Sequence, residues 1–133
     1  MYRVLALTAV CALLSGALFA QVGLREEPKI EDGLFSISVA DKIRRECNSI
    51  SGRLFKAQRE MRALADHAIA LGYSEDQIRA YVNDPVEKTR MRVRRNGYLL
   101  DKGVVESRPE TYCIVGRAEI EKSSKIGALL RAR

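Results

Sequence analysis

The cysteines are the residues of this chain with the most distinctive chemistry. One of the three, Cys11, falls inside an apolar run near the start, which leaves Cys47 and Cys113 for the rest of the chain. In an exported protein an isolated pair of cysteines most simply forms one disulfide. The loop that it closes contains 67 residues (47 to 113 inclusive), and the chain-entropy model gives such a bridge about 4 kcal/mol of stability. The alternative is a pair of buried, unpaired thiols.

The single histidine, His67, has apolar neighbours at helical spacing and no carboxylate among them. The sequence therefore favours a partly exposed helix position for His67 over a role as general base or metal ligand. One histidine and two bridged cysteines are too few for a transition-metal site, and no phosphate-binding glycine loop or nucleophile elbow is present. We expect no metal, no cofactor and no enzymatic activity, although catalysis by carboxylates alone would need only two acidic groups in one cleft.

The most specific polar feature is the run EKTRMRVRR, residues 87–95. On a helix, Lys88, Arg92 and Arg95 share one side. We predict that these three cations dock the chain on an acidic protein surface or on anionic phospholipid headgroups. The alternative is an ordinary solvated face. Nucleic acid is not expected, because no aromatic residue interleaves with the arginines to stack on bases.

The start of the chain predicts export. Arg3 precedes an uncharged apolar run from Val4 to Ala20 that ends in small residues, a pattern typical of a secretory signal peptide over residues 1–20. The remainder would then be periplasmic, with 22 basic residues (23 less Arg3) against 17 acidic ones and a net charge of +5. The alternative is an inner-membrane anchor over residues 4–20, since this run is at the short end for a membrane span.

Helices must position these residues. Residues 21–33 contain a proline and two glycines without periodicity, which predicts a flexible arm. From Phe35 to Leu71, apolar residues recur every three or four positions. This period predicts one long helix with a bend near residues 48–52, or two nearly collinear helices. A core helix is favoured over a dimeric coiled coil, and Gly72 is a natural end for it.

Helix caps divide the next stretch into two helices. Ser74 and Gln77 match a capping box that starts a short helix. Asp84 then matches an N-cap, with a proline at the first helical position. On this second helix Arg90 and Arg94 are expected to flank a buried face, which consists of Val86, Thr89, Val93, Gly97 and Leu100.

The last helix is predicted within residues 109–133, opened by a third capping box at Ser107 and Glu110. Small residues gather on one side of it. A disulfide requires Cα atoms within roughly 4.4 to 6.8 Å of each other, and Gly116, one turn from Cys113, would permit that approach. The alternative is that the small face receives a helix from another protein.

These elements predict an all-α domain of four or five helices over residues 34–133, because no alternating, strand-like run exceeds a few residues. With no catalytic motif, protein binding is the expected activity. The alternative is a periplasmic binder of small apolar ligands or unfolded chains. That function would require an apolar cavity between the long helix and the 85–102 helix.

Several segments resemble an uncharacterised family of small exported alphaproteobacterial proteins, a domain of unknown function. They are DGLFSISVADKIRREC, LGYSEDQIRAYV, EKTRMR, YCIVGRAEI and SKIGALLR, which lie within residues 31–133. The paired cysteines, the G-Y-S-x-x-x-I turn and the C-terminal I-G-x-L-L-R are the specific parts. The resemblance implies no activity and no cofactor. Because genes of the family tend to neighbour those of respiratory complex I, it implies an accessory or assembly role at the periplasmic face of that NADH dehydrogenase.

Overall fold

The computed structural model describes residues 23–133, so the predicted leader lies outside the described residues. The expected all-α domain of four or five helices is confirmed, with five α-helices in this range: α1 Pro28–Glu46, α2 Leu54–Ala70, α3 Glu75–Asn83, α4 Pro85–Asp101 and α5 Pro109–Glu121. Two short 3-10 helices and two short strands complete it: Leu24–Glu26, β1 Ile50–Gly52, Gly127–Leu129 and β2 Leu130–Ala132. None of these helices is long and apolar enough to cross a membrane.

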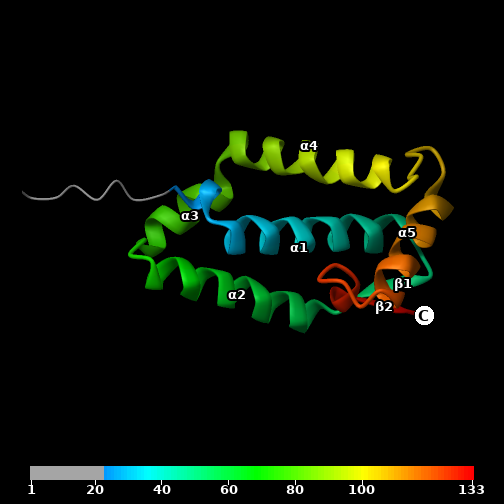
Figure 1. Ribbon diagram of the computed structural model, residues 1–133, viewed down its shortest axis with the longest axis horizontal. Helices are drawn as coiled ribbons and strands as arrows, with labels where there is room; N and C mark the ends of the chain where they lie inside the picture. The colour runs from blue at the N-terminus through cyan, green and yellow to red at the C-terminus, as the bar shows by residue number, and fades with distance from the viewer. Residues whose placement is uncertain (1–22) are drawn as a thin grey trace, which may run out of the picture.

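Helix α1 lies at the centre of the molecule (Figure 1). It packs against α2 on one side and α4 on the other, while α5 packs against the end where α1 finishes. The short helix α3 links α2 to α4 at the opposite end. The central helix therefore contributes to both ends of the molecule and to the surface between its two neighbours.

The prediction of one long or two collinear helices over residues 35–71 is wrong. Helix α1 ends at Glu46, the chain reverses, and α2 runs back beside α1. The reversal passes through β1, which pairs antiparallel with β2, Ile50 opposite Ala132. The segment NSISG contains poor helix formers. Its backbone forms hydrogen bonds with β2 instead of continuing the helix. Only part of the apolar series is buried: Val39 and Ile43 of α1 and Leu64 and Ala68 of α2, while Leu54, Met61 and Leu71 are exposed.

The flexible arm predicted over residues 21–33 is also wrong in the part of it that is described. Pro28 is the first residue of α1, a position that proline favours because no backbone donor is needed there. Leu24 and Ile30 are buried and form a small apolar cluster with Ala68. The segment is therefore packed against α2 rather than extended.

The main core surrounds the disulfide end of the molecule. It is built from the second half of α1, β1, the end of α4, α5 and the C-terminal segment, and its buried residues are Val39, Ala40, Ile43, Cys47, Ile50, Leu99, Val104, Tyr112, Val115, Ile126, Leu129 and Leu130. Elements from both halves of the chain thus share one core, as a single domain requires.

Gly116 accounts for the small face of α5. A Cβ atom on it would lie 2.5 Å from Ile50 Cδ1 and 2.7 Å from Ile43 Cγ2. The predicted close approach at this position is confirmed, and the chain's own α1 and β1 occupy the face. An outside helix is not needed to explain this glycine.

The last helix is shorter than predicted, because α5 ends at Glu121 and not near residue 133. Ser123 has a φ of 51°, and the chain then turns back, with the backbone N–H of Ser124 donating to the Glu119 carbonyl at 3.3 Å. Gly127 passes so close to α5 that a Cβ on it would overlap this carbonyl. Its small size serves the return of the chain to β2 rather than a helix face.

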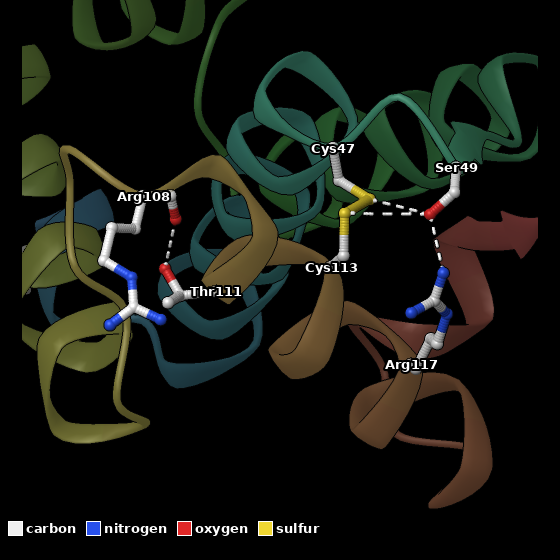
Figure 2. Close-up of a disulfide and its surroundings, with 6 residues drawn as sticks. All are labelled: Cys47, Ser49, Arg108, Thr111, Cys113 and Arg117. Atoms are coloured by element: carbon white, nitrogen blue, oxygen red, sulfur yellow. Dashed lines mark hydrogen bonds between the residues drawn. A yellow bond between two sulfur atoms is a disulfide. The ribbon is translucent and has the colours of Figure 1, made fainter.

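Two of the three predicted caps are confirmed. Ser74 and Gln77 form the capping box of α3, and the Asp84 side chain accepts bonds from the first backbone N–H groups of α4. The third is wrong, because α5 begins at Pro109 and no capping box forms at its start. Instead the Thr111 hydroxyl donates to the Arg108 carbonyl at 2.7 Å (Figure 2).

Two helical glycines give a matched test of this packing. We expect Gly116→Ala to destabilise the protein by about 1–3 kcal/mol, because the clash with Ile43 and Ile50 is an overpacking strain. Gly97→Ala should stabilise it by up to about 1 kcal/mol, since a Cβ there meets nothing within 4 Å and alanine favours the helix. Urea unfolding of both variants measures the difference. A Gly116→Ala variant as stable as the Gly97→Ala variant would contradict the close approach.

Candidate binding groove

The predicted disulfide is confirmed. Cys47 and Cys113 are bonded at an S–S distance of 2.03 Å with their Cα atoms 5.1 Å apart, joining the end of α1 to α5. The Ser49 hydroxyl lies 3.3 Å from the sulfur of Cys47 and 3.7 Å from that of Cys113, and Arg117 donates to it at 2.7 Å (Figure 2). Cys47 is completely buried, so the bridge is partly shielded from soluble thiols.

Helix α4 is turned the opposite way from the sequence prediction. The face expected to be buried points outward, with Val86, Val93 and Leu100 exposed by 67, 68 and 58%. Leu99 lies in the main core, and the Tyr98 ring packs edge-on against Phe35 of α1 at 5.3 Å. The side of α4 that carries Arg90 and Arg94 therefore faces α1.

Carboxylates at the start of α1 explain this orientation. Glu31 is buried, and its Oε1 accepts bonds from Arg90 at 2.7 Å and from the Tyr81 hydroxyl at 2.6 Å. Arg94 pairs with Asp32 at 3.0 Å. A buried carboxylate is costly without such partners, so α4 presents its arginines to α1. Sequence reasoning missed Glu31 because it lay in the predicted arm.

This network extends to the surface through Glu87, which accepts bonds from Arg90 and from Arg25. The bonds from Arg25 are the main cause of a lowered pKa of Glu87. The bond to Glu31 raises the pKa of Arg90, and burial followed by the same carboxylate raises the pKa of Tyr81. Each shift stabilises the form found at neutral pH, so the network acts as a permanent structural clamp.

An open groove of about 320 Å³ lies on α1 between α2, α3 and α4. Its apolar lining comes from all four helices: Leu34, Ile37, Met61, Val82 and Met91. Lys88, Arg92 and Arg95 line the same groove from α4. The structure thus brings together the three cations singled out from the sequence, beside an apolar surface between α1 and α4.

These three cations differ from the other arginines of α4. In residues 23–133 the side-chain nitrogens of Lys88, Arg92 and Arg95 form no ion pair with a carboxylate, while Arg90 and Arg94 are ion-paired. Within that range the Arg92 side chain donates to the hydroxyl of Thr89, and the Arg95 side chain to the side-chain carbonyl of Asn96. Burial, followed by the charge of Arg92, lowers the pKa of Arg95. An external anion at the groove would offset the repulsion between these two arginines.

The groove offers binding chemistry. In the part of the chain that the structure describes, no group of three or more histidine, cysteine, aspartate or glutamate residues could hold a metal ion. His67 lies 3.1 Å from Glu27, a carboxylate that sequence neighbours did not reveal, and neither residue lines the groove. The expectation that the protein has no enzymatic activity stays a prediction.

The fold and site define a small all-α, disulfide-bonded protein with an open cationic groove. A family model described as "Family of unknown function (DUF5333)" matches residues 22–131, and the chain belongs to this family. Comparisons with curated proteins and with solved structures gave no match. The resemblance to a domain family of unknown function is confirmed, while its alphaproteobacterial origin and its genes' proximity to complex I stay predictions.

Arg90 and Arg92 of α4 both line the groove, but only Arg90 is ion-paired with a buried carboxylate in residues 23–133. We expect Arg90→Gln to destabilise the protein by about 2 kcal/mol, because it removes a charged hydrogen-bond donor from the buried Glu31, which keeps its bond from Tyr81. Arg92→Gln should change stability by less than about 0.5 kcal/mol, as for most surface substitutions. Chemical unfolding of the two variants measures this, and equal effects would mean that the two sets of cations do not have separate roles.

Proposed function

We propose that this protein is an exported, non-catalytic factor that binds a partner protein through the groove. One observation carries the proposal: Lys88, Arg92 and Arg95 border an apolar groove and have no carboxylate partner in residues 23–133. Unpaired cations beside apolar surface complement a segment that presents apolar side chains and carboxylates together.

The groove fits one known mode of recognition, in which an amphipathic helix lays its apolar face on a hydrophobic surface. Met61 and Met91 line it, and methionine adapts to partner side chains of different shape. Acidic residues along the same partner helix would meet the three cations. Charge complementarity of this kind raises the association rate and selects against basic partners.

The disulfide supports a periplasmic address, because such bonds persist in oxidising compartments and are rare in the bacterial cytoplasm. The signal-peptide pattern over residues 1–20 supports export as well. In the narrower form of the proposal, the partner is the periplasmic face of a membrane respiratory complex, the NADH dehydrogenase. The predicted gene neighbourhood of the family supports this form.

A second candidate function is the binding of a small apolar ligand or an unfolded chain. The groove's volume of about 320 Å³ falls at the lower end of the range for ligand sites. Its apolar lining suits a hydrocarbon, and its cations suit an acid group. We favour the protein partner because the groove is open to solvent, whereas ligand sites enclose most of their ligand's surface.

Capture from detergent-solubilised membranes without reductant tests the proposal. We expect the protein to enrich NADH dehydrogenase subunits, and Arg92→Glu to lower that enrichment several-fold. Arg79→Glu is the matched control, because Arg79 is exposed on α3 and does not line the groove. If neither the wild-type protein nor the control enriches respiratory subunits, the narrower form fails. A small ligand seen by native mass spectrometry would favour the second candidate.

A further inference from the structure

Two large apolar side chains project into solvent where α2 begins. Leu54 is exposed by 59% and Phe55 by 81%, the highest value among the large apolar residues of the described chain. Their backbone is held in place, since only Arg53 separates them from β1 and the Arg53 N–H donates to the Leu129 carbonyl at 2.8 Å. A fixed backbone presents these side chains in a defined direction, at the end of α2 that lies beside the two strands (Figure 1).

Cations surround this projection. Leu54 and Phe55 line a hollow of about 400 Å³ together with four basic residues and no carboxylate: Arg53, Lys56, Arg59 and Arg131. In the described range none of the four forms an ion pair, and Arg53 donates to the Leu130 carbonyl at 3.2 Å. We call Arg53, Leu54, Phe55, Lys56, Arg59 and Arg131 the cationic tip.

We propose that the cationic tip docks the protein on a membrane surface that contains anionic phospholipid. Phe55 and Leu54 would enter the interface between headgroups and acyl chains, while the four cations lie against the phosphates. A tip of one charge sign complements a uniformly anionic lipid surface better than a protein surface of mixed charge. A projecting phenyl ring also needs a preformed pocket in a protein, whereas lipid adapts to it.

This inference goes beyond the proposed function. The cationic tip and the groove share no lining residue. Contact of the tip with lipid would therefore leave Lys88, Arg92 and Arg95 free for a partner. Membrane docking would also concentrate the protein in the plane where a membrane-embedded partner lies.

The chain contains no tryptophan, so Phe55→Trp provides a local fluorescence reporter. We expect its emission to shift to the blue when vesicles of phosphatidylcholine and phosphatidylglycerol are added, and to return at high salt, which screens surface charge. Val93→Trp is the control, because Val93 is also exposed, on α4, but lies outside the tip. The signal reports position 55 itself, whether or not residues before 23 also contact lipid.

Charge reversal in the same background tests the cations. We expect Lys56→Glu with Arg59→Glu to lower vesicle affinity at least tenfold, since each basic residue near an anionic surface contributes roughly fivefold. Arg79→Glu should have no effect, and circular dichroism checks that each variant folds. An equal shift with phosphatidylcholine alone, or an equal shift at position 93, would overturn the proposal. No shift with anionic vesicles would overturn it as well.

Discussion

The fold depends first on the covalent bond between Cys47 and Cys113. It fixes the end of the central helix against α5 across a sequence separation of 66, and the main core is built around it. Gly116 lets the two elements approach, and β1, three residues beyond Cys47, joins β2 to close the same end. Both candidate binding surfaces depend on this arrangement. Residues of α1 line the groove, and β1 fixes the backbone from which the cationic tip projects.

A second constraint acts at the opposite end, where Glu31 and Asp32 hold Arg90 and Arg94. This clamp decides which side of α4 faces α1 and so divides the basic residues of one helix into two groups. Those that meet carboxylates hold the fold together, while Lys88, Arg92 and Arg95 border the groove and have no such partner in the described part of the chain. A strongly basic helix can therefore serve stability and binding at once, because its two faces meet different electrostatic environments.

The features that could be predicted from the sequence are those with a local or covalent cause. The caps at Ser74 and Asp84, the disulfide and the close approach at Gly116 each follow from a few residues and their chemistry. The reversal of the chain near residue 50 was missed because the apolar period continues through it. Only the pairing of β1 with the distant β2 distinguishes this reversal from a bend within one long helix. The three groove cations were identified, but the groove itself needs α1, α2 and α3 in place.

The rotation of α4 shows why the rest could not be predicted. Val86, Val93 and Leu100 form a regular apolar stripe, and a buried face is the usual meaning of such a stripe. The buried Glu31 opposes this orientation, because its partner Arg90 lies on another side of α4, 59 residues further along the chain. No local pattern links these two residues, so the outcome depends on tertiary charge pairing rather than on periodicity.

Intact-mass measurement of the native protein, denatured without reductant and exposed to an alkylating agent, tests the central constraint most directly. If the bridge holds the fold, neither Cys47 nor Cys113 takes up the label, and the mass is lower than that of the reduced chain by two hydrogen atoms. After reduction both cysteines should be labelled. Labelling of Cys47 and Cys113 without prior reduction would contradict the account.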